Sequence, residues 1–212
     1  MRACSPAVPR AWLLAAIAAS ALAACDQTGG DGPANGSATV AKQYEGPKPE
    51  GVSSPDDAVT TTFYIPQAAI SDMFEIEASE IALVRARSPE VKAFARQMVA
   101  DHRKSSEMLR RFVADHPVNI AIPQNIDPRR QAMLANLNEA GDEEFDGVYI
   151  GGQAAAHQEA YNLHSSYGAR GDYPALKAVA QKTAELVAAH RRHVETLDAQ
   201  FGPDAQAVPA GQ

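Results

Sequence analysis

Apolar side chains recur every three to four residues through most of the chain, and no stretch alternates between apolar and polar positions. This period is that of an amphipathic α-helix and argues against a β-sheet domain. Proline after serine or aspartate marks helix starts, and glycine or proline marks helix ends. The expected helices lie at about 66–87, 89–116, 128–138, 141–168 and 174–201.

Four of these helices are long, and the third is short. The links near Ser88 and Gly171 are tight, so each joins two antiparallel neighbours. Residues 117–140 join the two hairpins and contain the short helix. The pattern predicts an all-α fold, a ferritin-like four-helix bundle over residues 61–201, with the direction of the middle connection left open.

The first 24 residues differ from the rest. Arg2 and Arg10 precede an apolar stretch that is short for a membrane span, as in export signals. The sequence Leu-Ala-Ala-Cys ending at Cys25 resembles the lipobox of bacterial lipoproteins, in which that cysteine is lipidated. We therefore expect a lipoprotein signal peptide over residues 1–24; an ordinary cleaved signal is the alternative. The following residue, Asp26, leaves the choice between inner and outer membrane open.

Residues 25–60 are rich in glycine and proline, poor in large apolar side chains, and predicted to form a disordered tether from the membrane. A disordered tail is expected at 202–212. Removing residues 1–24 removes two arginines and lowers the formal charge from −7 to −9. This acidic balance, without a Lys/Arg stripe, argues against a nucleic-acid partner.

Each long helix carries one ionisable residue near its middle, within the apolar stripe. These residues are Glu77, His102, His157 and His190. At a rise of 1.5 Å per residue they lie within about two turns of one layer, whichever way the middle connection runs. A buried cluster of one carboxylate and three imidazoles is therefore expected.

Two interpretations of this cluster stay open. Three imidazoles and a carboxylate are ligands that suit a closed Zn or Cu site. Alternatively, the histidines are neutral, hydrogen-bonded and structural. A di-iron centre needs Glu-x-x-His on two helices. Val99, Ala154 and Val187 stand three residues before the histidines, so this motif is absent. Its absence argues against a di-iron centre.

Four further residues are candidates for supporting roles. Asp101 cannot face the same direction as His102, because successive helix residues point about 100° apart. It is expected at a helix–helix seam, either orienting an imidazole of a neighbouring helix or exposed. Tyr149 and Gln153 are candidate hydrogen-bond partners for the cluster, and Asp146 stands one turn before Tyr149.

Several short motifs together resemble a known family. They are Glu-Ile-Glu at 75–77, Ser-Pro-Glu-Val-Lys-x-Phe-Ala from 88, Asp101-His102, Phe145-Asp146-x-x-Tyr149, His157 and His190. This set is similar to the exported ferritin-like proteins of domain-of-unknown-function family 4142. The resemblance implies a ferritin-like bundle, establishes no activity, and groups Asp101, His102, Asp146, Tyr149 and His157 as one set.

The expected function is that of a membrane-tethered, periplasm-facing accessory protein that binds a partner or responds to stress without catalysis. The alternative is a periplasmic metalloprotein that stores Zn or Cu or carries out redox chemistry at the Glu/His cluster. No Ser/His/Asp or Cys/His arrangement for nucleophilic catalysis can be built from the sequence.

Overall fold

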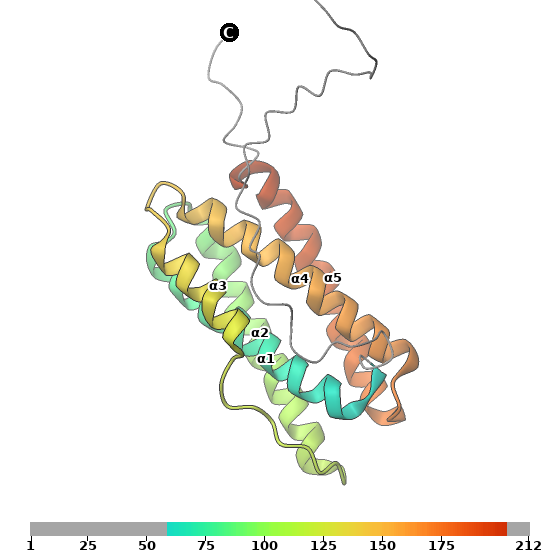
Figure 1. The fold of residues 1–212 in the computed structure, drawn as a ribbon. Coiled ribbons are helices and arrows are strands. Elements are labelled where there is room, and N and C mark those ends of the chain that lie inside the picture. Colours follow the sequence, from blue (N-terminus) through green and yellow to red (C-terminus); the bar gives the residue numbers. More distant parts are fainter. Residues whose placement is uncertain (1–58, 203–212) are drawn as a thin grey trace, which may run out of the picture. The chain divides into compact units, whose positions relative to one another are not determined.

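The computed structural model describes residues 59–202, which form an all-α fold. The helices are α1 (Thr61–Arg85), α2 (Pro89–Asp115), α3 (Pro128–Glu139), α4 (Phe145–Arg170) and α5 (Pro174–Phe201) (Figure 1). The predicted fold class is confirmed. No helix in this range is both long and apolar enough to cross a membrane. The signal peptide, Cys25 and nearly all of the tether and tail lie outside the described residues.

The two hairpins pack so that α1 lies against α4 and α2 against α5. The end of α1 meets the start of α4, where Arg85 lies over the Phe145 ring, and the start of α1 meets Asp172 beyond the end of α4. Hence α1 and α4 are antiparallel, and α2 and α4 run in the same direction. The connection from α2 to α4 therefore crosses the length of the bundle, as in ferritin-like folds.

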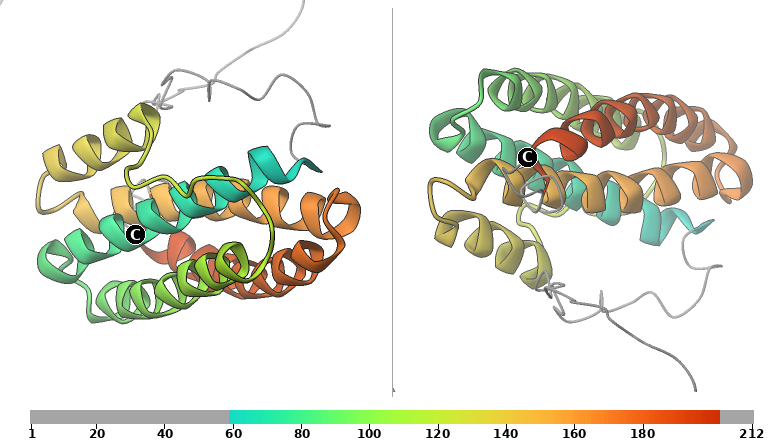
Figure 2. Two further views of the ribbon diagram at one scale, coloured as in Figure 1. Left: turned by 90° about the horizontal axis from the view of Figure 1, so that it is seen from below. Right: turned by 90° about the horizontal axis from the view of Figure 1, so that it is seen from above.

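The short helix α3 lies on the outside of the bundle, against α1 and α4 (Figures 1 and 2). At the C-terminal end of α3, the Arg85 guanidinium donates to three carbonyl oxygens, those of Leu137, Asn138 and Ala140. At the other end of α3, Arg129 pairs with Glu159 of α4. A cation near the C-terminal carbonyls of a helix interacts favourably with the helix dipole. The contacts of Arg85 and Arg129 together hold α3 in place.

Helix α1 is rotated from the orientation that its large aliphatic residues predict. It also begins before Pro66, which lies inside the helix. The apolar spacing predicts an interior stripe of Ile70, Met73, Glu77, Ile81 and Val84, but Glu77 is exposed and Val84 is 81% exposed. The interior face carries Phe74 together with small and acidic residues, among them Ala68, Asp72, Glu75, Ser79 and Ala82. Other large side chains of α1 face α3 instead of the bundle core. Ile81 of α1 and Leu134 of α3 line one groove between the two helices.

The apolar core consists of two clusters separated by a polar layer. The cluster nearer the α1–α2 turn includes Phe74, Phe94, Met98, Tyr149 and Val194. The cluster at the other end includes Tyr64, Ile65, Leu109, Tyr167 and Leu176. Between them, each long helix presents ionisable side chains to the interior. The flanking apolar clusters keep water from this layer, which strengthens every electrostatic interaction within it.

Candidate metal centre

Three histidine side chains from three different helices meet in the middle of the bundle. His102 belongs to α2, His157 to α4 and His190 to α5. The ring centroids are 5.6, 5.4 and 5.4 Å apart, so the rings occupy a nearly equilateral triangle. Each residue is at most 1% exposed. One nitrogen from each ring lies within 4.8 Å of the other two, an arrangement suited to holding a metal ion.

The other nitrogen of each ring has a hydrogen-bond partner that can only accept. His102 Nδ1 donates to Asp72 Oδ1 at 2.9 Å, and His157 Nδ1 donates to the backbone carbonyl of Gln153 at 2.9 Å. His190 Nε2 donates to Asp101 Oδ2 at 3.2 Å. Since a carboxylate or carbonyl needs a proton from its partner, these contacts fix the tautomer of each neutral ring. Metal-binding histidines are oriented in this way.

The atoms that remain have no hydrogen-bond partner among the described residues. They are His102 Nε2, His157 Nε2, His190 Nδ1, both carboxylate oxygens of Glu75, and Gln153 Oε1. All are buried, and in the tautomers above all are lone-pair acceptors. Each buried polar group left unpaired destabilises the fold by about 1–3 kcal/mol. The combined cost of these atoms would be comparable to the whole folding free energy of a domain.

Burial and nearby carboxylates oppose each other at the three imidazoles. Burial lowers the pKa of His190 to about 4 and also leaves the pKa of His157 lowered, although the charge of Glu75 counteracts it there. At His102 burial also lowers the pKa, but the hydrogen bond and charge of Asp72 outweigh it, and the pKa is raised. His157 and His190 are therefore neutral at pH 7 and have lone pairs free for a metal ion.

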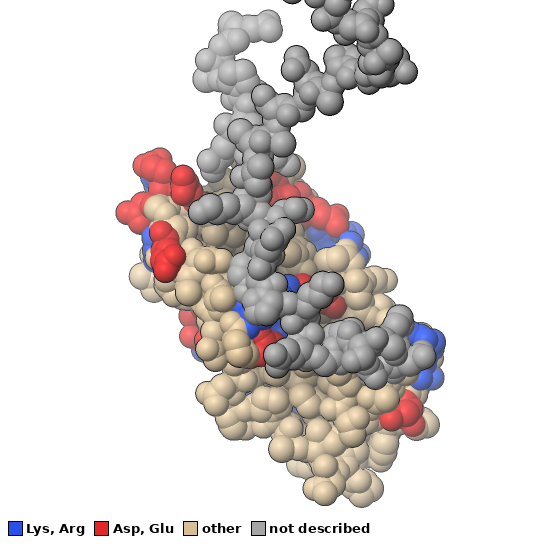
Figure 3. Space-filling model, viewed as in Figure 1, with Lys and Arg blue, Asp and Glu red and all other residues tan. Residues whose placement is uncertain are grey.

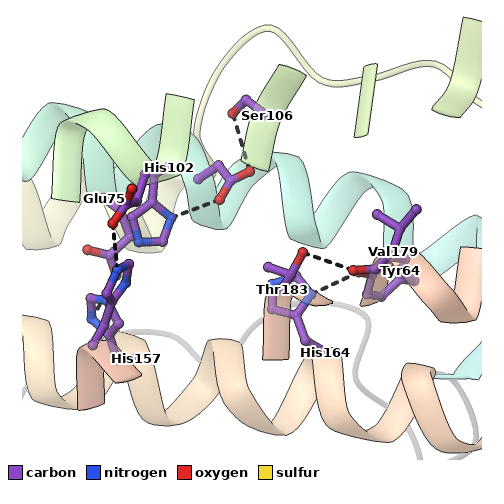
Figure 4. A network of polar contacts seen from close by, with 11 residues as sticks. Tyr64, Glu75, His102, Ser106, His157, His164, Val179 and Thr183 are labelled. Atoms are coloured by element: carbon purple, nitrogen blue, oxygen red, sulfur yellow. Dashed lines mark hydrogen bonds and ion pairs between the residues drawn. The ribbon is translucent and has the colours of Figure 1, made fainter. Parts of the chain in front are cut away.

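The carboxylate of this layer is Glu75, and the prediction of Glu77 is wrong. Side chains two residues apart on a helix point about 200° apart. Glu75 therefore faces the interior, while Glu77 is exposed along the groove between α1 and α3. Figure 4 shows Glu75 beside the His102 and His157 rings. Its Oε1 lies 3.6 Å from His157 Nδ1.

The supporting residues fall into different places. Asp101 lies at the seam between α2 and α5, half-buried, between His190 and Lys104. The hydrogen bonds from these two residues outweigh its partial burial and lower the pKa of its carboxyl. Gln153 lies in the polar layer. Tyr149 is buried nearby and shares a hydrogen bond of 2.9 Å with Ser79.

Asp146 is not part of the cluster. Its two carboxylate oxygens accept the backbone N–H groups of Arg87, at 3.0 Å, and Ser88, at 2.8 Å. It therefore joins the start of α4 to the turn between α1 and α2.

Sequence reasoning missed Asp72 and Glu75. Asp72 is 2% exposed and also accepts from Ser106. Both acids share a helix face with Ala68 and Ser79, so small residues at that spacing were the available signal for the interior face of α1. A further buried contact, Tyr64 to His164 Nδ1 at 2.8 Å, lies toward the other end of the bundle (Figure 4).

Residues 46–197 match DUF4142, a family described as a domain of unknown function. The chain belongs to this family. The resemblance drawn from its short motifs is thereby confirmed. No curated protein matches the sequence of this DUF4142 member.

Two solved structures share the fold of this DUF4142 chain. One is CopM in the Cu(II)-bound form, with a TM-score of 0.55 and 19% identity, over 65% of this chain and 94% of that one. The other is CopM in the Ag-bound form, with a TM-score of 0.52 and 19% identity, over 67% and 97%. At this identity the likeness establishes the fold alone.

The donor atoms of this DUF4142 chain fit a transition-metal ion. Nitrogen ligands about 2.0–2.1 Å from a metal lie roughly 3.4 Å from one another, so each ring needs to shift by less than about 1 Å. Imidazole and carboxylate are ligands of zinc and copper. A water molecule fits this set poorly, since it has only two hydrogens to donate to converging acceptors.

Proposed function

We propose that this protein binds one copper or zinc ion at His102, His157 and His190 and serves as a non-enzymatic metal-binding protein of the cell envelope. The observation that carries the proposal is the convergence of buried, unpartnered acceptor atoms from three helices. A metal cation can pair with all of them at once. The three outer hydrogen bonds, which orient the rings, add support.

Copper(II) is the ion that we expect to bind most tightly. For a given site of nitrogen and oxygen ligands, affinity among divalent first-row metals peaks at Cu(II) and falls again at Zn(II). The two similar solved structures are of CopM with Cu(II) and with Ag, which supports a metal of this kind.

The enclosure of the site favours storage or sequestration over catalysis. Catalytic metals keep a position open for water or substrate. Here the three rings are at most 1% exposed and apolar clusters lie on both sides. The formal charge of the chain is −7, and on the face shown in Figure 3 acidic side chains gather where α3 meets α4. A negative surface attracts cations.

Metal content tests this proposal directly. The chain, purified without a metal-binding tag and loaded with Cu(II), should retain about one ion per chain after desalting, measured by mass spectrometry. His102→Ala and His157→Ala should each lower the retained copper to about a tenth or less. His193→Ala is the matched control: His193 is exposed, three residues after His190 on α5, and its loss should change nothing.

Retention of copper by both variants at the wild-type level would refute the site. Electron paramagnetic resonance of the Cu(II)-loaded chain adds a check on ligand type, since three imidazole nitrogens should couple to the copper. A spectrum without nitrogen coupling would also contradict the proposal.

The cell-envelope location is a further part of the proposal. It rests on the Leu-Ala-Ala-Cys sequence ending at Cys25 and on the glycine- and proline-rich residues that follow. Cys25→Ser should move the protein from the membrane fraction to the soluble fraction of cells. Unchanged membrane association of this variant would show that lipid on Cys25 does not hold the protein.

A further inference from the structure

Glu75 is a buried carboxylate without a protein partner. It is 0% exposed, and neither oxygen has a hydrogen-bond partner among the described residues. Its Oε1 lies 3.6 Å from Nδ1 of the neutral His157, beyond hydrogen-bond length. Burying a charge that has neither an ion pair nor hydrogen bonds costs free energy, so a cation bound near Glu75 would stabilise the fold.

The polar layer holds more negative than positive charge. Asp72 is buried as well, and its carboxylate accepts from His102 and Ser106. The one buried Arg or Lys in the described range, Arg130, pairs with Asp127 near α3. Asp101 has its own cation at the surface, Lys104. Among the described residues, the polar layer therefore contains the carboxylates Glu75 and Asp72 and no Lys or Arg side chain to balance them.

We infer that Glu75, buried beside His157, supplies negative charge to the metal site and that, with Asp72, it makes the site selective for divalent over monovalent ions. This inference rests on the proposed function of the three-histidine site. A divalent ion bound among Glu75, Asp72 and neutral imidazoles gives a buried layer of zero net charge. A monovalent ion such as Ag(I) leaves a net charge of −1, which is costly in a layer of low dielectric constant.

The test compares Zn(II) and Ag(I) binding to the full chain and its variants. Glu75→Gln keeps the shape of the side chain and removes its charge. Because Coulomb energy scales with ionic charge, the loss should be about 100-fold in Zn(II) affinity and only about tenfold in Ag(I) affinity. The ratio of the two dissociation constants, from competition with chelators in chloride-free buffer, should therefore shift about tenfold toward Ag(I).

Glu77→Gln is the matched control, because it makes the same chemical change two residues away on the exposed face of α1. Both affinities should stay within about twofold of wild type. An unchanged affinity ratio in Glu75→Gln, or an equal shift in Glu77→Gln, would overturn the inference.

Thermal unfolding gives a readout that does not depend on affinity. Without metal, Glu75→Gln should melt at the same or a higher temperature than wild type, because a buried unpaired charge is gone. With Zn(II), the rise in melting temperature should be smaller than in wild type. A metal-free Glu75→Gln chain that melts lower, with an undiminished response to Zn(II), would contradict this role of the Glu75 charge.

A second variant keeps the inference testable if Glu75→Gln does not fold, as judged by helical ellipticity. Glu75→Asp retains the charge on a shorter side chain, so Zn(II) affinity should fall while the preference over Ag(I) persists. Loss of that preference would overturn the inference. If wild type binds neither Zn(II) nor Cu(II), the proposed function itself fails, whereas binding with an unaltered ratio in Glu75→Gln defeats only the role of Glu75.

Discussion

Asp101 and His102 are sequence neighbours with separate tasks. His102 directs Nε2 into the interior, while Asp101 accepts a hydrogen bond from Nε2 of His190 on the neighbouring helix α5. Consecutive helix positions diverge by about 100°, so one dipeptide can contribute to the interior and to the α2–α5 seam at once. The aspartate thereby controls which nitrogen of His190 is free to bind metal.

Loss of Asp101 should weaken metal binding without removing a ligand. In Asp101→Ala the His190 ring loses the acceptor that orients it, and we expect Cu(II) affinity to fall about 10–100-fold, as for other outer partners of metal-binding histidines. Lys104→Ala is the control, because Lys104 is exposed and contacts the far oxygen of Asp101. Chelator competition should give it an affinity within about twofold of wild type; equal losses in both variants would contradict this role.

At the scale of the element, α1 is the helix whose interior face could not be predicted. The apolar spacing predicts a stripe through Glu77 and Val84, which are exposed, whereas Asp72, Glu75 and Ser79 are buried. In α2, α4 and α5 the predicted stripes carry the buried histidines. Helix α1 contacts α3 as well as α2 and α4, so it needs apolar residues on two sides.

Polar groups at the start of α1 also connect it to the C-terminal part of α4 and to Asp172 just beyond that helix. Thr61 donates its backbone N–H to Asp172 at 2.9 Å, and Tyr64 donates its hydroxyl to His164. Burial raises the pKa of Tyr64, so the hydroxyl stays protonated and donates to Nδ1 of a neutral His164. These contacts set the register of two helices that are far apart in sequence.

At the scale of the whole molecule, buried neutral histidines make the metal-free fold sensitive to acid. Burial lowers the pKa of His164 to about 4, whereas an unfolded histidine titrates near 6.5. Between about pH 6.5 and pH 4 the unfolded chain therefore binds a proton that the folded chain does not. The free energy of unfolding should fall by about 2 kcal/mol between pH 7 and pH 5 through this residue.

His190, with its pKa also lowered to about 4, adds to this loss, and His102, with its pKa raised, acts in the opposite direction. Urea unfolding of the metal-free chain at pH 7 and pH 5 measures the sum. His164→Asn should lose less stability on acidification than wild type, while the exposed His193→Ala should behave like wild type. An identical loss in His164→Asn would show that His164 does not contribute.

The sequence by itself determined the helical period, the two tight turns, the all-α class and the three histidines at mid-helix. These follow from local spacing, since an apolar stripe interrupted by a polar residue identifies a buried polar side chain wherever one helix face meets the core. The family resemblance likewise depended on short local motifs.

Only the tertiary structure decided which carboxylate joins the histidines and what each ring nitrogen contacts. Placement of α3 against α1 rotates Glu75 inward and Glu77 outward, a choice that depends on residues some 50 positions away. The antiparallel pairing of α1 with α4 likewise brings Asp72, Glu75 and His157 into one layer. Hydrogen bonds and metal geometry act over a few ångströms in space, and separation along the chain does not specify them.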